Sequence, residues 1–213
     1  WLIVGKSVVW ASDVNGQMYI NKSDGANGYE YFMGYKNSNG LNGGVFNPAY
    51  NTTNSIYSGI TPQSDDWFNL SLVLDRSENR LQLFLDGEVI AEKNDVDYTY
   101  ANNNNGKLCV GCYISTPDGN FLEGYKFDGD IKEILISNVA KYSNNYNPSD
   151  SLLSDDNTVS HYTFKPGELD EILYDHSGNQ NHGTIHGANW IENIYGCTDP
   201  YAENYDETAN VDD

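Results

Sequence analysis

The 213-residue sequence predicts an all-β fold in which two antiparallel sheets pack face to face as a jelly-roll β-sandwich. Apolar and polar residues alternate within residues 67–93, which is the period of half-buried strands. Many further short apolar runs are separated by turn residues such as Gly, Asn and Pro. No helical pattern is long enough to cover a sheet. Because a sheet with one apolar face must bury that face, a second sheet is the expected cover.

Residues 67–93 (WFNLSLVLDRSENRLQLFLDGEVIAEK) predict three consecutive strands around which the chain is organised. The first strand has Asn69 and Ser71 on its polar face, opposite an apolar face made of Phe68, Leu70, Leu72 and Leu74. Leucines repeat this alternation in the second strand. The pair Asp86-Gly87 then predicts a tight hairpin, since both residue types tolerate positive φ.

The rest of the chain gives shorter signals. We expect strands at 1–4 and 7–10 (or one strand bent at Gly5), then at 17–21, 29–36, 108–114, 127–137 and 159–164, with a last short strand through 185. Residues 37–58 are expected to form a long irregular excursion, and residues 138–156 a polar connection. Tyr29, Tyr31 and Tyr35 share one face of their strand. They are expected to belong to the core or to cover it, and the alternative is a stacking platform for sugars.

The charge balance is strongly acidic, with 31 Asp and Glu against 11 Lys and Arg and a net charge of −20. Such a chain repels phosphate backbones, so nucleic acid is not an expected partner. An acidic, Asn-rich surface suits an extracellular or high-salt setting and calcium sites, although it can also serve solubility alone. No apolar run is long enough to span a bilayer. Because the sequence starts at Trp1, we take it as a segment of a longer or processed polypeptide.

The three cysteines are Cys109, Cys112 and Cys197. Alternation along 108–114 predicts that Cys112 is a small core residue and that Cys109 points the other way. On one extended strand these two could not bridge without breaking it. The C-x-x-C spacing alone gives little support for zinc or redox chemistry, since no second pair accompanies it.

Three segments carry a family resemblance. They are 67–87 (WFNLSLVLD and LQLFLDG), 125–142 (YKFDGDIKEILISNVAKY), and HYTF at 161–164 together with DHSGNQNHGTIHGANW at 175–190. Together they resemble the laminin-G-like, or concanavalin A-like, lectin and glucanase family. The resemblance implies a concanavalin A-like sandwich. The family's hydrolases carry a carboxylate set on one strand, and the nearest match, DGDIKE at 128–133, begins with Asp and lies in a segment that resembles a non-catalytic signature. No catalytic residue is therefore assigned, and the chain is not expected to be an enzyme.

The loop at 175–187 is the expected calcium site. Asp175, Asn179 and Asn181 lie close together in a Gly-rich segment whose oxygens could surround a cation, and the resemblance implies structural calcium there. Asp130 or Glu133 could complete the shell, although Lys132 stands where the family usually has an acidic residue. The alternative is an Asx-turn in which Asp175 bonds its own backbone.

Residues 196–213 (GCTDPYAENYDETANVDD) resemble the start of a short cysteine repeat found at the ends of large secreted or surface proteins. The resemblance implies an oxidising setting, and a partner for Cys197 beyond this chain or, as the lesser option, at Cys109. We therefore predict two units: a laminin-G-like sandwich at 1–195 and a partial cysteine repeat at 196–213.

The sequence as a whole predicts a non-catalytic binding or adhesion module of a secreted or surface-exposed protein, for carbohydrate, with calcium in a structural role. Its partner would be a glycan or a neighbouring surface protein. The alternative is a structural module of a surface layer, fibre or viral coat that contacts neighbouring subunits. A shallow pocket with an aromatic rim would favour the lectin, and an extended assembly interface would favour the structural module. No ligand-binding residue is assigned.

Overall fold

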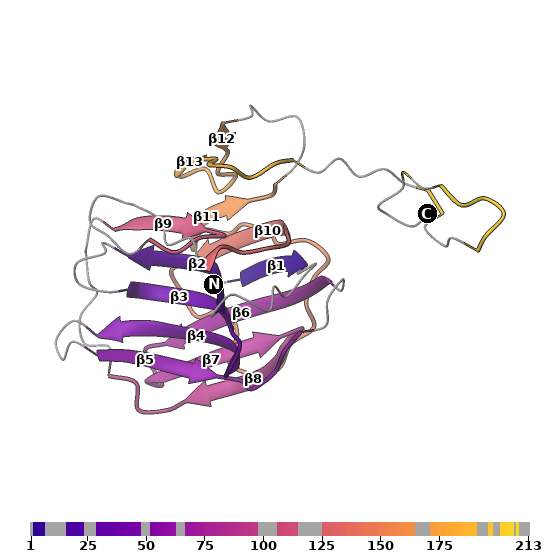
Figure 1. Cartoon of the computed structure of the whole chain (residues 1–213). Helices are drawn as coiled ribbons and strands as arrows, with labels where there is room; N and C mark the ends of the chain where they lie inside the picture. The colour runs from indigo at the N-terminus through magenta and orange to yellow at the C-terminus, as the bar shows by residue number, and fades with distance from the viewer. Residues whose placement is uncertain are drawn as a thin grey trace.

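The computed structural model describes residues 2–6, 16–23, 29–47, 52–62, 67–97, 106–114, 125–164, 171–190, 196–197, 201–206 and 208; for 2–6, 29, 47 and 52 it describes the backbone alone. Most of these residues form two antiparallel sheets stacked as a jelly-roll sandwich (Figure 1), and the described part of the chain contains no α-helix. The predicted fold class is confirmed.

The six-stranded sheet has the order β11-β10-β1-β6-β7-β8. Its strands are β1 (Leu2–Lys6), β6 (Trp67–Asp75), β7 (Arg80–Leu85), β8 (Glu88–Lys93), β10 (Asp130–Ser137) and β11 (Thr158–Tyr162). The five-stranded sheet has the order β5-β4-β3-β2-β9, with β2 (Gly16–Ser23), β3 (Tyr29–Lys36), β4 (Gly40–Asn47), β5 (Thr52–Tyr57) and β9 (Lys107–Val110). A two-stranded ribbon of β12 (Ile172–Leu173) and β13 (Gly183–Thr184) follows β11.

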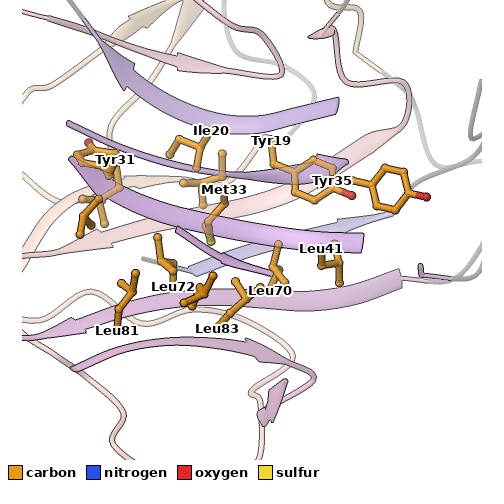
Figure 2. Close-up of a cluster of buried hydrophobic side chains, with 14 of the residues drawn as sticks. Tyr19, Ile20, Tyr31, Met33, Tyr35, Leu41, Leu70, Leu72, Leu81 and Leu83 are labelled. Carbon is orange, nitrogen blue, oxygen red and sulfur yellow. The ribbon is translucent and has the colours of Figure 1, made fainter. Parts of the chain in front are cut away.

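The core lies between the two large sheets (Figure 2), where the predicted apolar face of the meander packs. Leu70, Leu81 and Leu83 are fully buried there. Tyr31 and Tyr35 of β3 belong to the same core cluster, which confirms the core interpretation of these tyrosines; the side chain of Tyr29 lies outside the described residues. The sheets therefore bury the leucine face against each other, as the alternation predicts.

The predicted hairpin at Asp86 and Gly87 joins β7 to β8. Both residues have positive φ, 48° and 80°, as a primed two-residue turn requires. Gly87 also lies against another segment, because its carbonyl oxygen accepts a hydrogen bond from the Tyr146 N–H at 2.9 Å. The hairpin is thus fixed both by its own turn geometry and by the connection that passes over it.

The expectation of a long irregular excursion over residues 37–58 is wrong, because β4 and β5 lie there. β4 is rich in glycine, and in a sequence several glycines usually indicate a loop. At Gly44, however, an added Cβ would lie 2.6 Å from a ring carbon of Phe32 and 2.9 Å from the Asn54 carbonyl oxygen. Glycine stands in this strand because neighbouring atoms leave no room for a side chain.

The expectation that Cys109 and Cys112 cannot bridge is also wrong. β9 ends at Val110, and Gly111 turns the chain with φ of 72°, so the two cysteines do not lie on one strand. Their Cα atoms are 5.7 Å apart and they form a disulfide. Cys109 is the buried member and Cys112 is half-buried, the reverse of the predicted facing. The disulfide also removes Cys109 as a partner for Cys197, which is a free cysteine here.

The polar connection between β10 and β11 covers the outer face of the six-stranded sheet, away from the core. Ser71 and Phe84 point to that outer face, yet both are fully buried. Tyr142 and Tyr146 of the connection pack on Phe84, with ring centroids 6.3 and 5.6 Å away. Both faces of β6 and β7 are therefore buried.

No helix in the described residues is long and apolar enough to cross a membrane.

Replacing Gly87 by alanine tests the contact between the hairpin and the connection. A Cβ at Gly87 would lie 1.8 Å from the Tyr146 carbonyl oxygen, and alanine is strained at this positive φ. We expect Gly87→Ala to lower the free energy of unfolding by about 3 kcal/mol, the sum of the strain and the overpacking. Gly59→Ala is the control: its φ is 69° with no atom within 4 Å, so a loss of about 1 kcal/mol is expected. If chemical denaturation gives the same loss of unfolding free energy for both variants, the contact between Gly87 and Tyr146 is contradicted.

Candidate functional site

A shallow recess of about 300 Å³ lies at the start of β6 on the outer face of the six-stranded sheet. Four parts of the chain build it: the first residues of β6, the hairpin after β7, one residue of β10, and the connection after β10. Its lining residues are Trp67, Phe68, Asn69, Asp86, Lys132, Pro148, Ser149 and Asp150. The recess thus combines an aromatic ring with amide, hydroxyl, carboxylate and ammonium groups.

Trp67 is the aromatic wall of the recess. Because Phe68 points into the core, alternation along β6 directs Trp67 outward, to the same side as Asn69. Trp67 is 49% exposed, an unusual position for so large an apolar side chain. An exposed indole beside polar groups offers a flat apolar surface to a ligand that also needs hydrogen bonds.

Asn69 is a polar group of the recess that is held in one orientation. It is only 5% exposed. Its side-chain oxygen accepts a hydrogen bond from the Tyr146 hydroxyl at 3.0 Å, and its backbone N–H donates to Asp86 Oδ1 at 2.7 Å. No described residue accepts a hydrogen bond from its side-chain amide. With the oxygen occupied, Asn69 presents its NH₂ group as a donor to whatever enters the recess.

Tyr146 fixes that orientation. Its ring stacks on Tyr142, with centroids 3.6 Å apart and planes 2° from parallel, and its edge meets Phe84. Its hydroxyl also bonds Ser71 Oγ at 2.7 Å. Burial raises the pKa of Tyr146 to about 12. The hydroxyl therefore keeps its proton at neutral pH and can donate to Asn69.

Two carboxylates and one ammonium complete the polar lining. Asp86 uses one carboxylate oxygen to accept the Asn69 N–H. The Asp150 carboxylate has no hydrogen-bond partner among the described residues, while its backbone oxygen accepts a hydrogen bond from Lys132 Nζ at 3.3 Å. Neither Asp86 nor Asp150 forms a salt bridge within the described part of the chain. Both carboxylates can therefore accept hydrogen bonds from a ligand.

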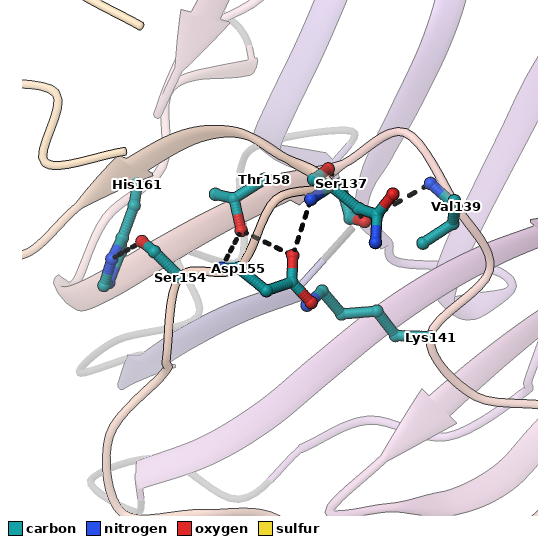
Figure 3. Close-up of polar contacts among 8 residues, drawn as sticks. Ser137, Val139, Lys141, Ser154, Asp155, Thr158 and His161 are labelled. Atoms are coloured by element: carbon teal, nitrogen blue, oxygen red, sulfur yellow. Dashed lines mark hydrogen bonds and ion pairs between the residues drawn. The ribbon is translucent and has the colours of Figure 1, made fainter. Parts of the chain in front are cut away.

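A buried pair behind the recess pins the connection to the sheet. Glu133 of β10 accepts the backbone N–H of Leu152 at 2.9 Å, and its other oxygen lies 2.7 Å from His161 Nε2 on β11. His161 Nδ1 lies 2.9 Å from Ser154 Oγ (Figure 3). Glu133 and His161 are 5% and 7% exposed. These contacts begin two residues after Asp150, so they hold one wall of the recess in place.

The far end of the connection is held by a turn at Asp155. Its carboxylate accepts hydrogen bonds from Asn157 N–H at 3.0 Å and Thr158 Oγ1 at 3.1 Å, and it pairs with Lys141 at 2.7 Å (Figure 3). The hydrogen bond from Lys141 and these donors lower the pKa of Asp155 below its ordinary value. The connection is thus tied to itself at the point where it enters β11.

The predicted calcium residues lie elsewhere, in the loop between β12 and β13. Asp175 is 7% exposed and accepts four hydrogen bonds. Its Oδ1 accepts the N–H groups of His161 and Ser177, each at 2.9 Å. Its Oδ2 accepts Ser177 Oγ at 2.8 Å and the Asn181 N–H at 3.0 Å. These bonds include the Asx-turn of the alternative interpretation, and they occupy both carboxylate oxygens.

Asn179 and Asn181 direct amide donors, not oxygens, at their partners. Asn179 Nδ2 donates to the Thr158 carbonyl at 2.8 Å, and Asn181 Nδ2 donates to the Val159 carbonyl at 2.9 Å. These carbonyls belong to β11, the edge strand of the six-stranded sheet. The loop therefore caps the polar groups of an edge strand, which otherwise form a template for aggregation.

This donor set does not fit a calcium shell, which needs several oxygens turned toward one point. Of the two residues suggested to complete the shell, Glu133 is already bonded to His161 and Leu152. No group of three or more His, Cys, Asp or Glu side chains in the described residues could hold a metal ion. Calcium at this loop remains a prediction of the sequence.

A larger concavity of about 2110 Å³ opens between the sheets beside β9 and β10. Much of its lining consists of side chains at the margin of the core: Leu108, Val110, Phe127, Ile131, Phe164, Ile185 and Trp190. Charged and polar side chains such as Lys22, Glu30 and Asp128 also line this concavity, but they are spread over many parts of the chain. The smaller recess gathers its polar groups beside one exposed aromatic ring, so it is our candidate for a site that recognises a polar molecule.

No protein-family model matches the chain, and no curated protein matches it in sequence. Its fold is similar to that of a candidate carbohydrate-binding protein from Bacteroides ovatus, with a TM-score of 0.61 and 12% identity over 86% of this chain and 50% of that one. The chain thus spans half the length of that protein. At this identity the likeness shows the fold alone.

Two further solved structures are similar over 61% of this chain. The CBM40 of the Ruminococcus gnavus IT-sialidase has a TM-score of 0.49 and 18% identity over 70% of its length. The heptameric SAP-like pentraxin from Limulus polyphemus has a TM-score of 0.44 and 15% identity over 58% of its length.

Sequence reasoning assigned no ligand-binding residue and so missed the recess. One signal was available, because the alternation that sends Phe68 inward places Trp67 beside Asn69 on the polar face. The other signals were absent. Residues 132 and 148–150 lie far along the chain, and only the path of the connection brings them to Trp67.

The edge-capping role of Asp175 predicts a dependence of stability on pH. Burial alone would raise the pKa of Asp175, but hydrogen bonds from His161, Ser177 and Asn181 outweigh it and leave the pKa below its ordinary value. A lowered folded-state pKa stabilises the fold above pH about 4 and loses this effect as the pH falls through the folded value. We expect Asp175→Asn to cost about 2 kcal/mol at pH 7, and less as the solution is acidified.

Asp156→Asn is the matched control, because Asp156 is exposed and makes no side-chain hydrogen bond within the described residues. In denaturant unfolding between pH 3 and 7, the free energy of unfolding of this control should differ from that of the wild type by close to zero. A loss for Asp175→Asn that stays constant across that range would contradict the charged-acceptor role.

Calcium is tested by thermal unfolding with added calcium and with chelator. Because both oxygens of Asp175 are occupied, we expect the same unfolding midpoint in both conditions. A bound metal would instead raise the midpoint with concentration. A rise that Asp175→Asn abolishes would establish the predicted site and contradict the conclusion that the loop does not fit a calcium shell.

Proposed function

We propose that this chain is a non-catalytic carbohydrate-binding module and that the recess at Trp67 is its sugar site. The observation that carries the proposal is the pairing of an exposed indole with a buried, pre-oriented amide. Trp67 is 49% exposed, and Asn69 beside it is 5% exposed with its oxygen bonded to Tyr146. Sugars have an apolar ring face and a rim of hydroxyls, so they need both an apolar platform and fixed hydrogen-bonding groups.

The recess meets the geometric requirement for such a ligand. Its volume of about 300 Å³ is at the lower end of the range for small-molecule sites. Hydroxyl groups donate and accept, and the lining supplies acceptors at Asp86 and Asp150 and donors at Asn69 and Lys132. A shallow pocket with an aromatic rim also favours a lectin over a structural module.

Rigidity of the lining supports binding further. Asn69 is locked by Tyr146, and the connection that carries Pro148 to Asp150 is anchored by Glu133 at Leu152. A pre-organised site loses less conformational entropy when a ligand binds. The fold adds a general argument, since the similar protein from Bacteroides ovatus is itself a candidate carbohydrate-binding protein. We place the module in a secreted or surface-exposed protein, as the sequence predicts.

Our proposal of binding without catalysis is supported by the state of one carboxylate in the segment that resembles a hydrolase motif. A glycosidase needs two carboxylates that flank the scissile bond. In the segment that resembled a hydrolase motif, Glu133 is buried and bonded to His161 and Leu152. We therefore propose binding without hydrolysis.

Replacing Trp67 by alanine tests the site. We expect the wild-type fragment to bind one or more glycans on a broad array, and Trp67→Ala to weaken that binding about thirtyfold, the effect of removing a central aromatic anchor worth about 2 kcal/mol. Tyr57→Ala is the matched control, since Tyr57 is 48% exposed but lies on β5 of the other sheet. The control should bind as the wild type does.

The array is run with calcium and again with chelator, and titration calorimetry then gives the affinities. Because no cation takes part in the proposed contacts, binding should survive the chelator. If Trp67→Ala and Tyr57→Ala lose the same amount of glycan affinity, the sugar site does not lie at Trp67. No binding to any glycan would overturn the proposal and favour the structural module that contacts neighbouring subunits.

A further inference from the structure

The charges around the recess indicate which class of sugar it takes, an inference that rests on the function proposed above. Two carboxylates, Asp86 and Asp150, line the recess against one ammonium, that of Lys132. Lys132 Nζ already donates to the Asp150 carbonyl at 3.3 Å, whereas neither carboxylate has a cationic partner in the described part of the chain. The side chains that line the recess therefore carry a net negative charge.

Hydrogen-bonding capacity points the same way. An ionised carboxylate is an acceptor only, so Asp86 and Asp150 can bond a ligand only through groups that donate. The hydroxyls of a neutral sugar donate, and each bond between a hydroxyl and a carboxylate is charge-assisted. A sugar carboxylate or sulfate group has no proton to give at neutral pH, so it cannot donate to either aspartate and is repelled by their charge.

The pre-oriented amide completes a pattern that suits neighbouring hydroxyl groups. Asn69 is only 5% exposed, so more than nine-tenths of it is buried, and its NH₂ group has no acceptor among the described residues. One hydroxyl can accept from Asn69 and donate to Asp86, whose carboxylate is already placed beside the Asn69 backbone at 2.7 Å. This independent feature makes the recess more than a group of acidic residues.

The overall charge strengthens the discrimination at low salt. The chain carries a net charge of −20. At physiological ionic strength charges beyond about 8 Å are largely screened, so the two recess carboxylates decide the preference there. At low ionic strength the whole chain adds to the repulsion of an acidic ligand.

From these observations we propose that the recess selects neutral sugars and rejects acidic ones such as sialylated, uronic or sulfated glycans. Trp67 contacts the apolar face of the ring, Asn69 donates to a ring hydroxyl, and Asp86 and Asp150 accept from the hydroxyls of the same or the next residue. Lys132 keeps Asp150 in place through the backbone.

The test uses an array of matched glycan pairs that share one core, with and without an acidic group, such as lactose with sialyllactose and cellobiose with its uronic acid. We expect the neutral member of a recognised pair to bind at least about tenfold more tightly at physiological salt, with a wider gap at low salt. Asp86→Asn and Asp150→Asn should each weaken binding of the neutral glycan about tenfold. Each should also reduce the difference in affinity between the neutral and the acidic member of the pair. Asparagine tolerates the positive φ of Asp86, so the fold should persist, and thermal unfolding checks this.

Asp156→Asn removes the same charge from an exposed position outside the recess and should leave both affinities unchanged. Trp67-dependent binding in which the acidic members are preferred, and in which Lys132→Gln removes that preference, would overturn this inference while the proposed function stands. If no member of any pair binds in a Trp67-dependent way, the proposed function fails, and this inference fails with it.

Discussion

The outer face of the six-stranded sheet depends on one hydroxyl, that of Tyr146. It donates to Asn69 at 3.0 Å and bonds Ser71 at 2.7 Å, and both of these polar residues would otherwise be buried beside apolar rings. Buried polar groups without partners are costly, so this contact permits polar side chains under the connection. The same contact orients Asn69, holds the connection on the sheet and shapes the recess. A structural requirement and a candidate binding feature thus share one atom.

The other constraint is the edge of the sheet at β11. A sandwich that is not closed into a barrel leaves edge strands whose backbone groups seek partners. Here the loop after β12 supplies them, with Asp175 accepting the His161 N–H and with Asn179 and Asn181 donating to β11 carbonyls. The motif that suggested calcium therefore has a physical role without a cation. Asp and Asn serve either role, because both need short polar side chains in a loop with permissive backbone geometry.

The sequence predicted those parts of the fold whose signals are local. Alternation in 67–93 located three strands, and Asp86-Gly87 located their hairpin, since each of these signals lies within a few residues. The strand at 40–47 was missed because its glycines are explained by close packing across the sheet, as at Gly44 against Phe32. The strand at 52–57 (TTNSIY) was missed because most of its residues are polar. The disulfide of Cys109 was missed because it depends on where β9 ends, and a strand boundary is set by tertiary contacts. Of the recess, only the neighbours Trp67 and Asn69 were within reach of sequence reasoning.

The size of the recess has a consequence for how such a module would work. A volume of about 300 Å³ has room for a small part of a glycan, and its open shape leaves much of the ligand in water. Affinity for one sugar unit is therefore limited by the few contacts available, even though the rigid lining lowers the entropic cost of binding. For the proposed carbohydrate-binding module, strong attachment to a repeated ligand would then come from several modules acting together, because linked binding events raise the effective concentration of each later one. On the proposed function, each module would contribute specificity, and the number of engaged modules would set the strength of attachment.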